Sequence, residues 1–128
     1  MSTFELNTQN LSGVTGACLF SRREIYEEVG YMEEELFKVA FNDVDFCLKI
    51  REKGYLIVYN PYIELWHYES KTRVYENTPE KQARFEKECN NLKTKWKELL
   101  SKPDPYLNIN FSRNTALYNI RTDKIETE

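Results

Sequence analysis

The hydrophobic positions of this chain change their spacing several times, and each change predicts a different structural element. Residues 1–12 are polar and have no periodicity, so a flexible lead-in is expected there. An apolar run then extends from Val14 to Phe20, which is too short for an ordinary helix and suits a buried strand. The core is therefore predicted to begin near residue 13.

Two helices are predicted from the residues that start and stop them. Residues 22–29 follow Ser21, which has a glutamate three positions later in the spacing of a capping box, and they precede Gly30, a favourable helix stop. Asn42 is a favourable N-cap for a second helix, whose apolar positions continue until Gly54 ends it. Sheet and helix are thus expected to alternate in the first half of the chain.

Beyond the second helix, β-branched and aromatic residues predict two extended segments, 55–59 and 62–66, with a turn at Asn60-Pro61. Strands and helices in this order predict an α/β fold with a small mixed sheet and about three helices. The core of this fold is expected over residues 13–101.

The longest helix is predicted over 79–101, because Thr78-Pro79 is a strong helix start. Apolar residues recur on one of its faces at spacings of three and four, namely Phe85, Cys89, Leu92, Trp96 and Leu99. We expect its stripe of Phe85, Leu92 and Trp96 to pack across the sheet. Residues 102–128 are expected to form an extended tail.

Composition narrows the function classes. The 128 residues, 41% of them hydrophobic, fit one domain, and a net charge of -3 with both signs interspersed argues against a nucleic-acid partner. No apolar run approaches the roughly 20 residues of a membrane span. The first residues also lack the charged and apolar zones of a signal peptide. The expected location is the cytoplasm, including the inner face of the membrane. Three widely spaced cysteines predict reduced, mostly buried thiols.

Two carboxylates, Asp43 and Asp45, lie in the first turn of the helix predicted after Asn42. Side chains two positions apart on a helix point about 200° away from each other, so at most one of them can face a given pocket. The helix N-terminus favours the ionised carboxylate that a general base requires. Because first-turn carboxylates commonly serve only to bind free backbone N–H groups, both interpretations stay open.

Further candidates lie outside this helix. His67, the single histidine, follows an extended segment and is a candidate metal ligand or proton carrier, with simple packing at a strand end as the alternative. The glycine of Thr15-Gly16-Ala17 either permits close approach of a ligand or another backbone, or equally allows tight packing. Trp66 can stack on a sugar face or simply pack against other residues, and Arg22-Arg23 can bind phosphate or form a solvated turn.

Five groups of residues occur in a fixed order along the chain: Val14-Thr15-Gly16-Ala17-Cys18-Leu19-Phe20, Val29-Gly30-Tyr31, Val39-Ala40-Phe41-Asn42-Asp43-Val44-Asp45-Phe46-Cys47-Leu48-Lys49, Gly54-Tyr55 and Leu65-Trp66-His67-Tyr68-Glu69-Ser70. This ordered set resembles the C-terminal, acceptor-side half of family 2 glycosyltransferases of the GT-A fold, in particular bacterial rhamnosyltransferase-like and polysaccharide-biosynthesis enzymes. The match runs nearly end to end.

The resemblance implies that Asp43 is the catalytic base, which deprotonates the acceptor hydroxyl as it attacks the anomeric carbon with inversion. It implies that His67 joins the aspartates of an Asp-x-Asp motif around a Mg or Mn ion that neutralises the departing diphosphate. The residues that it places on the acceptor side are Thr15, Gly16, Ala17, Asp45 and Trp66.

Two positions depart from the family pattern: Asn42 stands where many relatives have glutamate, and Met32-Glu33 where many have an aspartate after the Gly-Tyr pair. The nucleotide-binding half of the family, with its Asp-x-Asp motif, would precede residue 1. We therefore expect 1–128 to be the C-terminal part of a catalytic domain that is inactive alone and binds no metal by itself. Its partners would be a nucleotide-sugar donor, held through the other half, and a saccharide acceptor.

A second hypothesis is a non-catalytic module that binds glycan or protein through its aromatic surface. Under the first hypothesis, removal of half a continuous sheet leaves an exposed edge strand and apolar surface, which predicts self-association as a homodimer.

Overall fold

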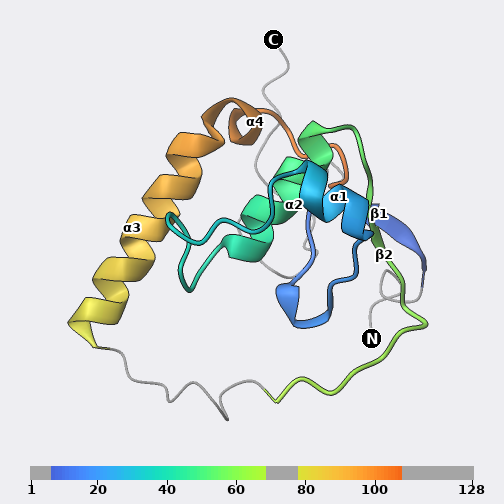
Figure 1. The fold of residues 1–128 in the computed structure, drawn as a ribbon, viewed down its shortest axis with the longest axis horizontal. Helices are drawn as coiled ribbons and strands as arrows, with labels where there is room; N and C mark the ends of the chain where they lie inside the picture. Colours follow the sequence, from blue (N-terminus) through green and yellow to red (C-terminus); the bar gives the residue numbers. More distant parts are fainter. Residues whose placement is uncertain (1–6, 69–77, 108–128) are drawn as a thin grey trace, which may run out of the picture.

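The computed structural model describes residues 7–68 and 78–107 (Figure 1). Within these residues the elements are a two-stranded sheet, four α-helices and one 3₁₀ turn. In chain order they are β1 (Gln9–Leu11), the 3₁₀ turn Gly16–Cys18, α1 (Arg23–Glu28), α2 (Asn42–Glu52), β2 (Ile57–Tyr59), α3 (Pro79–Lys95) and α4 (Lys97–Ser101). The mixture of helix and sheet agrees with the predicted α/β class.

The sheet differs from the predicted one. β1 pairs antiparallel with β2, with Gln9 opposite Tyr59 and Leu11 opposite Ile57. A strand therefore forms inside 1–12, where a flexible lead-in was expected, and the mixed sheet is replaced in the described residues by two antiparallel strands. Three residues are too few to show the alternation of apolar and polar positions that predicts a strand from sequence. β1 forms because it pairs with β2, which lies far along the chain.

The apolar run 14–20 forms no strand. It is irregular backbone around the 3₁₀ turn, in which the Ala17 N–H donates to Thr15 Oγ1 at 3.4 Å. The Gly16 N–H donates to the side chain of Asp43, at the start of α2, and so is not paired with a neighbouring strand. The second predicted extended segment, 62–66, is likewise outside any strand.

Local signals predicted the ends of α1 and α2 well, but the expected N-cap at Asn42 is wrong, because Asn42 is the first helical residue of α2 and Phe41 occupies the cap position without a side-chain bond. Gly30 and Gly54 follow these helices with φ of 81° and 88°, the left-handed conformation that glycine adopts without strain. The expected cap at Ser21 is wrong, because its hydroxyl donates to the Arg22 carbonyl and makes no bond to the first turn of α1.

α2 is the central element of the fold and is buried on two sides. One core cluster joins α2 to α1 and β2 and consists of Val29, Phe46, Cys47, Ile50 and Ile57. A second cluster joins α2 to α3 and consists of Phe37, Leu48, Leu92 and Trp96. Each large apolar side chain buried in this way contributes about 1.5–3 kcal/mol to stability. These two clusters hold α2, and so its first turn, in a fixed position.

α3 packs against α2, and this corrects the expectation that it crosses the sheet. Figure 1 shows α2 between α3 and the two strands. The single helix predicted over 79–101 is also divided, because Trp96 leaves the helical conformation with φ of -109° and ψ of 24°. The indole of Trp96 nevertheless packs in the second cluster, so α3 and α4 share the same core.

No helix in the described ranges is long and apolar enough to cross a membrane. Of the predicted tail 102–128, the structure describes the part up to Leu107, where Asp104 Oδ1 accepts the Tyr106 N–H at 2.9 Å. Residues 108–128, together with Glu69-Ser70 of the family pattern, lie outside the described residues.

Candidate functional site

The carboxylate of Asp43 is fixed at the N-terminus of α2 by backbone N–H groups. Its Oδ2 accepts the Gly16 N–H at 2.9 Å, and its Oδ1 accepts the Val44 N–H at 2.8 Å. The helix N-terminus adds the partial positive charge of the first turn. These contacts set the direction of the Asp43 side chain.

Gly16 allows this close approach. A Cβ atom at this position would lie 3.3 Å from Asp43 Cβ and 3.6 Å from Oδ2. A side chain at Gly16 would therefore press on the carboxylate that its backbone binds. Of the two interpretations of the Thr15-Gly16-Ala17 motif, the contact seen is close packing of backbone against Asp43, and the motif also lines the neighbouring cleft.

An open cleft of about 680 Å³ lies beside the first turn of α2. It brings together residues that are far apart in the sequence, including Asp43 and His67. The other lining residues come from the 3₁₀ turn and the residue before it, the loop before α2, the start of α2, the segment before residue 69 and α3: Thr15, Gly16, Ala17, Met32, Val39, Ala40, Phe41, Asn42, Tyr68, Lys81, Arg84, Phe85 and Glu88. Five of the predicted site residues, Thr15, Gly16, Ala17, Asp43 and His67, thus share one concave surface.

Glu88 is a residue of this cleft that the sequence analysis missed. Its carboxylate is buried and accepts two backbone N–H groups of the loop before α2, from Lys38 at 3.2 Å and from Ala40 at 2.6 Å. Asn91 adds a third bond from α3 to this loop, since its Nδ2 donates to the Leu36 carbonyl at 3.1 Å. Glu88 lies four residues before Leu92, on the face of α3 that packs on α2, but its burial follows only from that packing and could not be assigned from the sequence.

The backbone just before α2 is strained at Phe41, which has a φ of 63°. The left-handed conformation of a residue with a side chain costs about 1–3 kcal/mol. The Phe41 ring packs against Phe85 of α3 with a centroid distance of 5.2 Å. This ring contact and the Glu88 bonds hold the strained turn that delivers Asp43 to the cleft.

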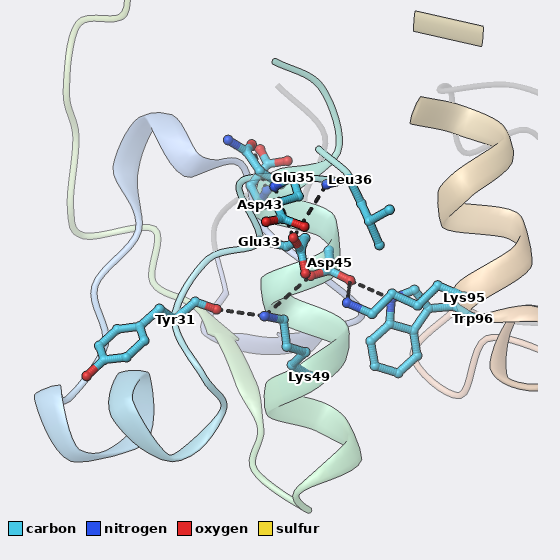
Figure 2. Close-up of polar contacts among 10 residues, drawn as sticks. Tyr31, Glu33, Glu35, Leu36, Asp43, Asp45, Lys49, Lys95 and Trp96 are labelled. Carbon is cyan, nitrogen blue, oxygen red and sulfur yellow. Dashed lines mark hydrogen bonds and ion pairs between the residues drawn. The ribbon is translucent and has the colours of Figure 1, made fainter. Parts of the chain in front are cut away.

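Asp45 does not line the cleft, which corrects its predicted contact with an acceptor. It is fully buried, and its Oδ1 binds Trp96 Nε1 and Lys95 Nζ, each at 2.8 Å (Figure 2). Lys49 Nζ lies 3.6 Å from Oδ2 and donates to the Tyr31 carbonyl. The helical periodicity that separates positions 43 and 45 explains why one carboxylate faces the cleft and the other faces α3.

Trp66 also lies outside the cleft lining, and its side chain is 89% exposed. The contact between Trp66 and an acceptor therefore stays a prediction, and any such contact would be made outside the cleft. Of the two arginines weighed for phosphate binding, Arg23 pairs with Glu27 at 2.8 Å on the surface of α1, as expected for a solvated turn. Glu33, at a position that departs from the family pattern, accepts the N–H groups of Glu35 and Leu36 in a local turn (Figure 2).

The predicted metal role of His67 gains no ligand set from residues 7–68 and 78–107. Over the described residues, no group of three or more histidine, cysteine, aspartate or glutamate side chains is arranged to hold a metal ion. His67 and Asp43 line one cleft, but two such residues do not make a Mg or Mn site. Any metal bound here would need further ligands from elsewhere.

The three cysteines are free thiols, but only Cys47 is buried, which corrects the expectation that most of them are buried. Cys47 Sγ accepts the Val14 N–H at 3.5 Å, and its S–H donates to the Val14 carbonyl. Burial raises the pKa of the Cys47 thiol above its ordinary value of 9.0. Cys47 thus anchors the segment that leads to Gly16 and is poorly suited to act as a nucleophile.

Comparison with known proteins finds two relatives. The uncharacterized protein y4gI of Sinorhizobium fredii is 51% identical over 89 residues, which are 70% of this chain and 10% of that protein. The O-antigen biosynthesis protein RfbC of Myxococcus xanthus is 36% identical over 73 residues, which are 57% of this chain and 6% of that protein. This chain is similar to a small segment of each.

The chain thus spans a tenth or less of the length of these relatives. No family model matches the sequence, and no solved structure matches it. The assignment to family 2 and to the GT-A fold therefore stays a prediction from the residue pattern.

Proposed function

We propose that this chain is the acceptor-side part of an inverting glycosyltransferase that acts in polysaccharide biosynthesis. The parent enzyme would transfer a sugar from a nucleotide-sugar donor to a glycan or lipid-linked acceptor. Similarity to part of an O-antigen biosynthesis protein supports the pathway, and the residue pattern of family 2 enzymes supports the reaction. The nucleotide-binding half would come from another part of the longer protein.

The observation that carries this proposal is the position of Asp43. Its carboxylate is held by two backbone N–H groups and lines an open cleft large enough for a sugar unit. In the proposed reaction Asp43 takes the proton of the acceptor hydroxyl while that oxygen bonds to the anomeric carbon. The bond from this carbon to the nucleoside diphosphate breaks at the same time, so the configuration inverts.

Other residues would complete the acceptor site. Thr15, Gly16 and Ala17 would form the wall opposite α3, and Gly16 would also hold the base in place through its N–H. His67 stays a proposed ligand of a Mg or Mn ion whose remaining ligands lie in the donor half. The steps assigned to Asp43 do not depend on that ion.

The test compares sugar transfer by the longer protein with and without the Asp43 carboxylate. Asp43→Asn should lower kcat by a factor of about 100 or more, which is the usual contribution of a general base. Glu52→Gln, an exposed change at the other end of α2, is the matched control and should leave kcat unchanged. Activity of Asp43→Asn close to that of the unaltered protein would refute the proposed base.

A second measurement tests whether the nucleotide-sugar site lies outside this chain, as the proposal requires. Titration of the 128-residue chain with UDP-, GDP- and dTDP-sugars in the presence of Mn should give no binding, and the chain alone should turn over none of them. Tight, metal-dependent binding would mean that this chain forms a nucleotide site itself.

The alternative is a binding module, and one observation favours it. Tyr62 and Trp66 are 85% and 89% exposed and offer aromatic faces outside the cleft. A module would bind glycan through these rings, so Trp66→Ala would abolish binding while Asp43→Asn would not. The enzyme hypothesis predicts that Asp43→Asn abolishes transfer and that loss of Trp66 leaves the chemical step intact.

A further inference from the structure

One face of α3 forms a wall of the cleft, and its charge changes along the helix. Lys81, Arg84 and Glu88 recur at spacings of three and four and all line the cleft. Glu88 is buried, whereas Lys81 and Arg84 are exposed to solvent. The wall thus has an acidic inner part and a basic outer part.

The carboxylates of the cleft already have partners. Asp43 binds the N–H groups of Gly16 and Val44, and Glu88 binds those of Lys38 and Ala40. In the described parts of the chain, no ion pair joins Arg84 to any acidic group. The positive charge of Arg84 is therefore not balanced by the acids of the cleft.

An apolar surface lies beside these cations. Phe85 follows Arg84 on the helix, its ring is 54% exposed, and it packs on Phe41 next to Asp43. An exposed aromatic ring near a cationic group suits a ligand with a ring face and a negative charge, since the sugar face covers the aromatic ring and the guanidinium binds the anion with two parallel hydrogen bonds.

We propose that the cleft binds its ligand through an anionic group, a carboxylate or phosphate, held by Arg84 with Lys81 beside it. The ring that carries this group lies against Phe85. In assigning the anion to a sugar acceptor the proposal rests on the proposed function, but anion binding itself can be measured without any reaction. The charge has two sources in cell-surface glycans, an acidic sugar or the phosphate of a lipid carrier or nucleotide.

The experiment titrates the ¹⁵N-labelled 128-residue chain with three probes and follows its amide signals. The probes are D-glucuronate, inorganic pyrophosphate and, as the neutral control, D-glucose. We expect a saturable shift of the amides of Ala17, Arg84 and Phe85 with at least one anion, and a weaker response at high salt. Glucose should give a clearly smaller shift.

Variants of α3 locate the anion. Arg84→Ala should weaken anion binding about tenfold or more, as expected for the loss of one charge-assisted contact. Lys81→Ala should weaken it in the same direction, and Lys87→Ala, an exposed change on the same helix outside the cleft, is the matched control. Because all three side chains are exposed, the folded spectrum should be retained in each variant.

The outcomes distinguish an acidic sugar from a phosphate as the source of the charge. They also distinguish the proposed anion site from the proposed role of Asp43 as a base. Stronger binding of glucuronate assigns the charge to an acidic sugar, and stronger binding of pyrophosphate assigns it to a phosphate. Equal shifts with glucose, no saturable shift, or the same weakening in Lys87→Ala would overturn the inference. None of these results bears on whether Asp43→Asn abolishes transfer, so the base can stand if the anion site fails.

Discussion

The indole of Trp96 donates a hydrogen bond of 2.8 Å to the buried carboxylate of Asp45, which joins the end of α3 to the first turn of α2. Lys95 binds the same oxygen at 2.8 Å. The carboxylate is fully buried, so each of these bonds is formed with little competition from water. The contact fixes the helix turn that also carries Asp43 on its opposite side.

Replacement of Trp96 by phenylalanine should lower the free energy of unfolding by about 1.5–3 kcal/mol, because a buried carboxylate loses one of its two short hydrogen bonds. Trp66→Phe is the control, and since Trp66 is 89% exposed it should change stability by about 0.5 kcal/mol or less. Urea denaturation of both variants measures the difference. Equal stability of the two variants would contradict the importance of this bond.

Glu88→Gln should destabilise the loop before α2. The amide keeps one acceptor oxygen but turns an NH₂ group toward one of the two N–H donors, so we expect a loss of about 1–3 kcal/mol. Hydrogen exchange of the Lys38 and Ala40 amides should accelerate as well. Glu86→Gln, on the exposed side of α3, should change neither quantity, and unchanged exchange in Glu88→Gln would show that the loop is held by other contacts.

Gly16→Ala should displace Asp43 from the Gly16 N–H. The new Cβ would lie 3.3 Å from Asp43 Cβ, and relief of this contact should cost about 1–3 kcal/mol. Gly13→Ala is the control, because its Cβ would meet Cys47 Cβ at an ordinary distance of 3.5 Å. Loss of the Asp43 to Gly16 bond can be followed by the amide shift of residue 16. A variant that keeps this shift and its stability would refute the steric argument.

Stability should fall at alkaline pH through Cys47. Burial raises the pKa of this thiol in the folded state, so above the pKa of the unfolded chain, near 9.0, the unfolded state releases the proton first. The contribution is fully present below that value and is lost as the pH rises toward the folded pKa. Urea midpoints of the unaltered chain should therefore fall more steeply above this pH than those of Cys47→Ala.

The control for this pH dependence is internal. The hydrogen bond to Glu28 raises the pKa of the Tyr55 hydroxyl in the same direction, but Tyr55 is present in both proteins and its effect cancels in the comparison. Parallel pH curves for the two proteins would show that Cys47 does not contribute. A thiol reagent should also label Cys18 and Cys89 before the buried Cys47.

Self-association stays a prediction, and the exposed apolar residues around β2 give it a location. Phe20, Leu56 and Val58 are 80%, 58% and 53% exposed and border an apolar hollow beside the sheet. Association through this surface should be seen by sedimentation velocity as a concentration-dependent increase in mass, reduced in Phe20→Ser. A monomer at all concentrations would count against a homodimer.

The helices could be predicted from the sequence because their signals are local. Gly30 and Gly54 end α1 and α2, and Thr78 caps α3 with its side chain accepting the Lys81 N–H. The sheet could be predicted only in part: the β-branched and aromatic run 55–59 indicated β2, whereas Gln9–Leu11 has no distinctive pattern and pairs with β2 across 50 residues. The apolar run near Gly16 predicted a strand, but its backbone bonds to a side chain of α2.

The residues of the candidate site also include some that could be predicted from the sequence and some that could not. Asp43 and His67 were predicted from their chemistry, and the structure brings both to one cleft, although their roles stay predictions. Glu88 and Asp45 could not be assigned, because their burial depends on how α3 packs on α2. A carboxylate that binds backbone amides or an indole resembles a surface acid in the sequence alone.

Glu88 and Asp45 are the two buried charged side chains of the described residues, and both link α3 to α2 or to the loop before it. The wall of the cleft that α3 forms is therefore held in a fixed position against α2. Because α3 is bonded both to α2 and to the loop before it, we expect the distance between α3 and Asp43 to be the same with and without a ligand in the cleft.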